Sequence, residues 1–249
     1  MTPLDAPRSS LHMLGVRVDD VTADETLTLV ERFIAERTPH QICTVNPEFV
    51  MRAQQDELFR NVLNNAAVCI PDGIGLLWAA RRLGHPLRER VAGSDLVGQM
   101  AARAAQRDWR LYFLGAAPGV ADRAATVLQA HYPGLVIAGT FPGSPAPAEE
   151  DEIVERIRAT RPDVLLVAFG APAQDLWIAR NVSRLQVPVA MGVGGSLDFI
   201  AGVAQRAPVW VRRIGLEWLY RLIHEPWRWR RQLALPRFVW QVLFAGPQR

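Results

Sequence analysis

Short apolar runs typical of buried strands alternate with segments of helical length along most of the chain, and this alternation limits the fold more than any other feature. The expected strands are residues 14–18, 41–46, 66–71, 111–115, 135–139, 164–170 and 187–195. The expected helices are residues 49–64, 76–83, 96–107, 120–132, 149–160 and 174–185, and one more begins near residues 20–25. Strands and helices in this order build a mostly parallel sheet covered by helices. We therefore expect an α/β fold with a Rossmann-like, mostly parallel sheet.

Three portions are expected along the chain. Residues 1–107 form a smaller N-terminal α/β portion that carries the catalytic residues, residues 108–205 form a Rossmann-like nucleotide-binding portion, and residues 206–249 form a helical, basic appendage. The appendage contains nine arginines and two glutamates, a net charge of +7, whereas the preceding residues contain 19 basic and 23 acidic residues. It also contains five of the eight tryptophans, so its charge and its aromatic content set it apart.

A basic surface rich in aromatic side chains suits the anionic headgroups of a membrane. Two other interpretations stay open: the tryptophans pack against the protein while the arginines face solvent, or the appendage binds single-stranded nucleic acid. Because no recognised nucleic-acid motif is present, we expect no nucleic-acid partner. The chain has no apolar run of eighteen residues and no signal peptide. We therefore expect a cytoplasmic protein that is peripheral to the inner face of the cell membrane.

A single carboxylate, Asp72, ends the apolar run of residues 66–71 and stands between a proline and a glycine. Parallel sheets bind ligands just beyond the carboxyl ends of their strands, so this position favours a chemical role. The alternative is that Asp72 caps a helix that starts near Ile74. Thr44 and Asn46 end the preceding strand, and because alternate residues share a face, both are expected to line one pocket.

Three of the expected strands exit through glycine, at residues 115–119, 170–172 and 192–195. Glycine lets backbone amides approach a phosphate, and the helix N-terminus that follows favours negative charge. We therefore expect a nucleotide or diphosphate ligand. The last turn lacks the final glycine of a nicotinamide-cofactor fingerprint, and the chain contains no lysine for a Walker-type loop. It has no cluster of metal ligands, and its two cysteines lie in apolar runs, so we expect no metal and no cofactor.

Six ordered groups of residues give the chain a resemblance to a known family. They are TVNP at 44–47, PDG at 71–73, ERVAGSD at 89–95, YFLG at 112–115, GAPAQD at 170–175, and RAP at 206–208 with GLEWLYR at 215–221 and EP at 225–226. With these motifs the chain resembles the WecG/TagA/CpsF family, glycosyltransferase family 26, over about residues 44–238. Members of this family make teichoic-acid linkage units, enterobacterial common antigen and related surface polysaccharides.

The resemblance implies a metal-independent, inverting transferase that moves a sugar from a UDP-sugar to a polyprenyl-diphosphate-linked saccharide. It implies that Asp72 is the general base, which favours this role over the helix cap, and that Thr44, Asn46, Arg90 and Gln174 line the active site. The substrate-binding residues that we expect are Gly115, Gly170, Pro172, Gly194, Asp198, Arg221, Arg228 and Arg231. The family's matching arginines are thought to fold over the bound nucleotide when the protein docks on the membrane.

Two departures from the family pattern bear on the substrate. The family usually has lysine and glutamate where this chain has Ala173 and Asp175, and residues 140–144 depart from a glycine-tyrosine pattern. The expected sugar is N-acetylmannosamine or a related hexose, with glucose and glucuronic acid as other candidates. The alternative functions are a non-catalytic nucleotide or nucleic-acid binding protein and a nicotinamide-dependent oxidoreductase. The sequence does not fix the oligomeric state, and a homo-oligomer is a possible form.

Overall fold

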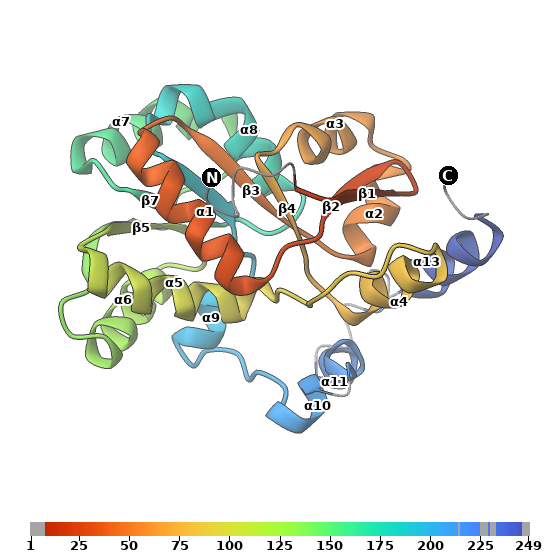
Figure 1. Cartoon of the computed structure of the whole chain (residues 1–249). Coiled ribbons are helices and arrows are strands. Elements are labelled where there is room, and N and C mark those ends of the chain that lie inside the picture. Colours follow the sequence, from red (N-terminus) through yellow and green to blue (C-terminus); the bar gives the residue numbers. More distant parts are fainter. Residues whose placement is uncertain (1–7, 214, 225–228, 230–232, 246–249) are drawn as a thin grey trace.

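The computed structural model describes residues 8–213, 215–224, 229 and 233–245, and at its centre six parallel strands form one sheet (Figure 1). The strand order is β4-β3-β8-β7-β5-β6. The strands are β3 (His40–Val45), β4 (Val68–Pro71), β5 (Arg110–Gly115), β6 (Val136–Phe141), β7 (Val164–Ala168) and β8 (Val189–Gly192). The expected α/β fold with a parallel sheet is confirmed. β3 pairs with β8, so strands from residues 1–107 and 108–205 share this sheet, and the boundary between those portions stays a prediction.

Helices cover both faces of the sheet. One face packs against α1 (Ala23–Glu36), α5 (Gly93–Arg107), α6 (Val120–His131) and α9 (Ser196–Ile200). The other face packs against α2 (Pro47–Ala53), α3 (Glu57–Asn65), α4 (Ile74–Arg82), α7 (Glu150–Thr160), α8 (Ala173–Leu185) and α13 (Ala234–Phe244). Side chains alternate along each strand, so Phe113 packs on the first face and Leu114 on the second. Such strands are buried on both faces, which explains their continuous apolar runs.

The strand expected at residues 14–18 is the turn and second strand of an antiparallel hairpin. The hairpin consists of β1 (Ser10–Met13) and β2 (Val16–Asp19). Leu14 and Gly15 form its two-residue turn, and both have positive φ, at 50° and 81°. A turn with two positive φ angles matches the twist of the paired strands.

The helix expected at residues 49–64 is two helices, α2 and α3. Asp56 begins the second, because its Oδ1 accepts a hydrogen bond from the backbone N–H of Phe59 at 3.0 Å. This capping bond satisfies a donor that α3 leaves unpaired in its first turn. The single-helix prediction was therefore wrong.

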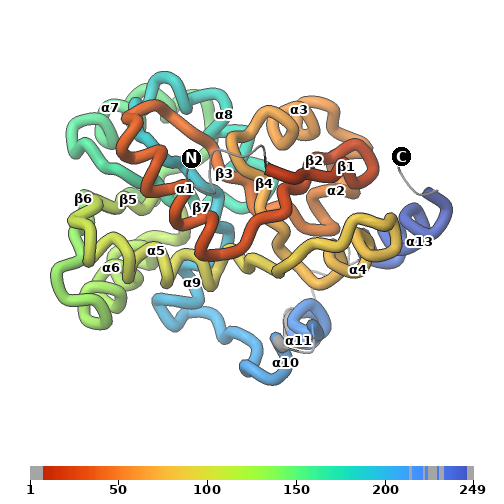
Figure 2. Tube along the Cα trace, viewed as in Figure 1, coloured from red at the N-terminus to blue at the C-terminus, as the bar shows by residue number. Residues whose placement is uncertain are grey.

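The C-terminal segment, defined as residues 206–245, returns to the N-terminal part of the fold. Its last described helix, α13, lies beside α4 (Figure 2). It buries Phe238 and Val242 in the same core cluster as Leu76. Its earlier helices are α10 (Val209–Arg213) and α11 (Glu217–His224). The residues that begin α11 line a cavity at the carboxyl end of the sheet, so the segment contributes to both the core and the site.

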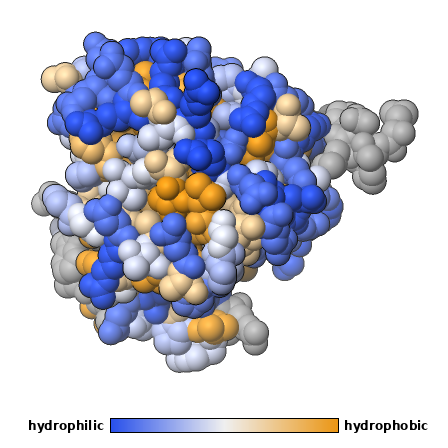
Figure 3. Space-filling model, turned by 90° about the vertical axis from the view of Figure 1, so that its left-hand side faces the viewer, coloured by the Kyte–Doolittle hydropathy of each residue, from blue (hydrophilic) through white to orange (hydrophobic). Residues whose placement is uncertain are grey.

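Large apolar side chains are exposed mainly on the C-terminal segment. They include Trp210, Trp218, Ile223, Trp229, Trp240 and Phe244. By contrast, the face turned to the viewer in Figure 3 is mostly hydrophilic, with an apolar patch near its middle and smaller apolar areas elsewhere. No helix within the described residues is long and apolar enough to span a membrane.

Candidate active site

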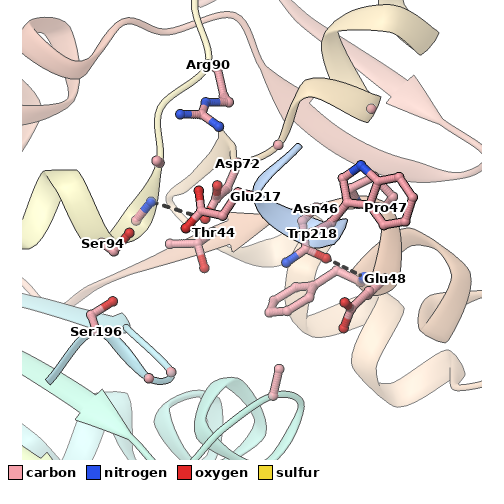
Figure 4. A pocket seen from close by; sticks show the side chains of 18 of the residues that line it. Thr44, Asn46, Pro47, Glu48, Asp72, Arg90, Ser94, Ser196, Glu217 and Trp218 are labelled. Carbon is pink, nitrogen blue, oxygen red and sulfur yellow. Dashed lines mark hydrogen bonds between the residues drawn. The ribbon is translucent and has the colours of Figure 1, made fainter. Parts of the chain in front are cut away.

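A cavity of about 310 Å³ opens beyond the carboxyl ends of four neighbouring strands (Figure 4). Residues that follow β3, β4, β7 and β8 form most of its wall, and residues of α5, α9, α11 and α13 also contribute. Its lining residues include Thr44, Asn46, Glu48, Asp72, Arg90, Gly93, Gly170, Gln174, Gly194, Glu217 and Trp218. Open α/β sheets bind their ligands at this edge, so the cavity is the candidate active site.

Asp72 follows β4 and is half-buried at the cavity. Its Oδ2 accepts a hydrogen bond from the backbone N–H of Gly93, the first residue of α5, at 3.1 Å. Gly73 caps the helix that begins at Ile74, and no side chain contributes a capping bond there. The alternative that Asp72 caps this helix was therefore wrong. Instead, the carboxylate is held by a helix 21 residues further along the chain.

The surroundings of Asp72 raise the pKa of its side chain. Burial raises the pKa of this carboxyl to about 6, although the Gly93 amide and the Arg90 guanidinium favour its charged form. The negative charge of Glu217 raises the pKa further. A carboxylate with a pKa near 6 is still ionised at pH 7 and is a stronger base than an exposed aspartate, whose pKa is about 4.

This raised pKa predicts the acid side of the pH profile. The base must be ionised to accept a proton, so we expect kcat/KM to fall about tenfold per pH unit below a midpoint near pH 6. An aspartate with an ordinary pKa would give this fall near pH 4. Initial rates between pH 4.5 and 8 would test this, with circular dichroism at each pH to confirm folding. A flat profile down to pH 4.5 would contradict the assignment of the base.

Thr44 and Asn46 lie on the cavity wall, as the sequence predicts. Asn46 also has a structural role, because its Oδ1 caps α2 by accepting a hydrogen bond from Phe49 N–H at 3.0 Å. Thr44 is buried against α5, where a Cβ on Gly93 would lie 2.9 Å from the Thr44 methyl group and 3.4 Å from Asp72 Oδ2. Glycine at position 93 therefore allows α5 to approach the base closely.

Gln174 is almost fully buried and links the turns that follow β7 and β8. Its Oε1 accepts hydrogen bonds from the backbone N–H groups of Gly170 at 3.2 Å and Gly194 at 3.0 Å. These two amides are therefore bound to Gln174, whereas the sequence suggested that they face a phosphate. A Cβ on either glycine would meet no atom within 4 Å, so their missing side chains leave space at the cavity.

Other expected substrate-binding residues lie away from the lining of this cavity. Gly115 ends β5 and packs against Ala168, whose carbonyl carbon would lie 2.8 Å from a Cβ on Gly115. Pro172 lines a second hollow, between α2 and α13. Asp198 lies in α9, where its carbonyl oxygen accepts hydrogen bonds from residues 203 and 204. Contact of these three residues with substrate stays a prediction.

Arg90 is half-buried on the cavity wall. Of the arginines expected at the site, it is the closest to Asp72 in the sequence. Its charge favours the ionised form of Asp72. Arg221 lies in α11, and Arg228 and Arg231 lie outside the described residues. Their predicted contact with the nucleotide is not tested by this arrangement.

Asp175, the shortened acid of the family motif, is fully buried. Burial raises the pKa of its carboxyl to about 7, an effect that the neighbouring Gln174 and Cys43 side chains oppose. A Cβ on Gly192 would lie 2.9 Å from Asp175 Oδ1, so a glycine is needed where this carboxyl packs against β8. The acid belongs to the core behind the site, not to the cavity lining.

The sequence analysis places arginines of the C-terminal segment at the substrate but does not identify Glu217 and Trp218. Both of these residues line the cavity. Arg206 and Arg212 hold the segment to α5, with ion pairs to Asp95 at 2.6 and 3.2 Å. Asp95, Arg206, Glu217 and Trp218 fall within the family-like motifs, but the motifs alone do not indicate this contact.

The parallel α/β sheet places a carboxylate of raised pKa, an arginine and glycine turns around one cavity. These are features of an enzyme that deprotonates a substrate and stabilises negative charge. The matching family model identifies the class. The chain belongs to the WecG/TagA/CpsF family of glycosyl transferases, whose model matches residues 11–249. The family resemblance is therefore confirmed, and the protein is a glycosyltransferase.

Three similar relatives carry the same name, N-acetylglucosaminyldiphosphoundecaprenol N-acetyl-beta-D-mannosaminyltransferase. The relative from Bacillus spizizenii is 38% identical over 81% of this chain and 78% of its own length. The one from Bacillus subtilis is 33% identical over 86% and 83%, and the one from Staphylococcus aureus is 30% identical over 94% and 92%. The alternatives of a non-catalytic binding protein and an oxidoreductase gain no support from these relatives.

Proposed function

We propose that the protein transfers N-acetylmannosamine, or a related hexose, from a UDP-sugar to a polyprenyl-diphosphate-linked saccharide, with inversion at the anomeric carbon. The observation that carries the proposal is the half-buried carboxylate of Asp72 at the cavity, with its pKa raised to about 6. The names of the three relatives support the sugar and the lipid-linked acceptor. Inversion follows from a single displacement, because the acceptor attacks from the side opposite the leaving group.

In this reaction an acceptor hydroxyl gives its proton to Asp72 as its oxygen attacks the anomeric carbon of the donor. The bond between that carbon and the UDP oxygen breaks, and UDP leaves with the electron pair. The Gly93 amide holds the carboxylate in place during the transfer. Negative charge grows on UDP, and Arg90 is the described cation on the cavity wall that can stabilise it.

The acceptor is a lipid, and we propose that the C-terminal segment places the enzyme on the inner face of the cytoplasmic membrane. Its exposed tryptophans and Phe244 supply apolar contact. The arginines from residue 206 onwards, apart from Arg206 and Arg212, which pair with Asp95, supply attraction to anionic lipids. α13 supports this role, because Phe238 faces the core while Trp240 and Phe244 are exposed. A helix with apolar residues on both sides suits contact with the protein on one side and lipid on the other.

One experiment tests the reaction and the membrane together. Purified protein is mixed with a panel of UDP-sugars and with anionic vesicles that contain a polyprenyl-diphosphate N-acetylglucosamine acceptor. We expect UDP release that depends on the acceptor and on one donor, and we expect the protein to sediment with the vesicles, less so at high salt. Absence of release with every donor, despite UDP binding, would contradict the substrates, and protein that stays in the supernatant would contradict membrane docking.

A further inference from the structure

Glu217 brings a second carboxylate into the catalytic cavity from a distant part of the chain. It is the first residue of α11, lines the cavity, and lies beside Asp72 and Thr44 in Figure 4. Its charge is close enough to raise the pKa of Asp72. About a fifth of its side chain is exposed, so the carboxylate is partly shielded and still accessible to a ligand.

A network of ion pairs holds this carboxylate at the cavity. Arg206 binds Asp95 at 2.6 Å and lies 3.7 Å from Glu217, and Arg212 also binds Asp95, at 3.2 Å. Asp95 lies in the first turn of α5, the same turn whose Gly93 amide binds Asp72. The same turn of α5 therefore binds Asp72 directly and is linked to Glu217 through Arg206.

The charge of the cavity indicates what Glu217 can bind. Glu48, Asp72 and Glu217 are acidic lining residues, and Arg90 is basic. A diphosphate is repelled by the carboxylates and attracted by the arginine. A sugar is neutral and offers many hydroxyl donors, which an ionised carboxylate can accept. The carboxylate side of the cavity thus fits a sugar better than a diphosphate.

Trp218 adds the second part of a sugar-binding surface. It follows Glu217 directly, lines the same cavity, and is 39% exposed. Small-molecule sites combine apolar aromatic surface with a few polar groups that fix orientation. A tryptophan ring can cover the apolar face of a pyranose, while the neighbouring carboxylate binds hydroxyl groups at its edge.

We propose that Glu217 is a further substrate-binding residue, which accepts hydrogen bonds from hydroxyl groups of a hexose in the cavity while Trp218 covers the sugar ring. This inference rests on the proposed function, since it requires a sugar substrate. The hexose belongs either to the donor or to the acceptor. It gives α11 a part in the substrate site that is separate from membrane docking.

Two Glu217 variants test the inference against a matched control. Glu217→Gln removes the charge at nearly constant size, and Glu217→Asp keeps the charge but shortens its reach. Glu155→Gln makes the same charge change at an exposed position on α7. We expect both Glu217 variants to raise the KM of one substrate, about 10- to 100-fold for the glutamine variant, and Glu155→Gln to change neither KM.

The pH profile tests whether the charge of Glu217 lies beside the base. Removing the charge beside Asp72 lowers the pKa of the base, so the acid side of the profile should move to lower pH in Glu217→Gln and stay near its original place in Glu217→Asp. A merely structural residue would lower thermal stability without a selective rise in the KM of one substrate. Thermal unfolding of each variant provides that comparison.

The substrate whose KM rises identifies the hexose as that of the donor or of the acceptor. Both KM values within twofold of the wild type would overturn the inference, and so would an equal loss of affinity for UDP alone, which contains no hexose. If the wild-type enzyme turns over none of the substrates, the proposed function itself fails. If it turns them over and Glu217→Gln matches it, only the role of Glu217 fails.

Discussion

Replacing Asp72 with asparagine is expected to lower kcat by about 10²- to 10⁴-fold. Asparagine has nearly the same size, and its side-chain oxygen can still accept the hydrogen bond from Gly93 N–H, so the cavity should keep its shape. What is lost is the group that accepts the proton. Affinity for UDP should not weaken, because the substitution removes a negative charge from the site. Turnover at saturating substrates and calorimetric UDP binding measure the two effects.

Asp56→Asn is the matched control for this variant. This substitution also replaces a carboxylate with an amide. The role of Asp56 is to cap α3 by accepting a hydrogen bond from Phe59 N–H, and asparagine caps a helix about as well. We expect this control to retain normal kcat and stability. If Asp72→Asn turned over substrates at the wild-type rate, Asp72 would not be the base, and the proposed mechanism would need another proton acceptor.

The position of the base could be predicted because the signal is local. An apolar run that ends at a carboxylate places that group at the carboxyl edge of a parallel sheet, and the structure has Asp72 there. The capping role of Asn46 at the start of α2 was not predicted. Asn46 is followed by Pro47, which occupies the first position of α2, and asparagine before such a proline is a frequent cap. This signal was available in the sequence.

Contacts between distant residues could not be predicted in the same way. The Asp95–Arg206 ion pair joins residues 111 positions apart, and nothing in either local pattern indicates the other. The place of β8 between β3 and β7 is likewise a property of the folded chain, because strand periodicity predicts a strand but not its neighbours. The cavity wall that Glu217 supplies depends on such contacts, which is why the sequence did not reveal it.

Replacing Gln174 with alanine is expected to lower both stability and activity. The side chain is 2% exposed, and its Oε1 is the acceptor for the backbone N–H groups of Gly170 and Gly194. Leaving both donors without an acceptor costs about 2–4 kcal/mol of the free energy of unfolding. In a chain of 249 residues this lowers Tm by roughly 4–16 °C. The turns that follow β7 and β8 also lose the side chain that links them, so kcat/KM should fall as well as Tm.

Gln41→Ala separates the two effects, because Gln41 is another buried glutamine that lies outside the catalytic cavity. Its Nε2 donates a hydrogen bond to the backbone oxygen of Asp175 at 3.0 Å. Truncation should lower Tm there too, while kcat/KM at a temperature well below unfolding stays close to the wild type. Equal kinetic losses in both variants would mean that activity follows stability alone. A loss confined to Gln174→Ala would mean that the two glycine turns must be held together for the substrate to bind.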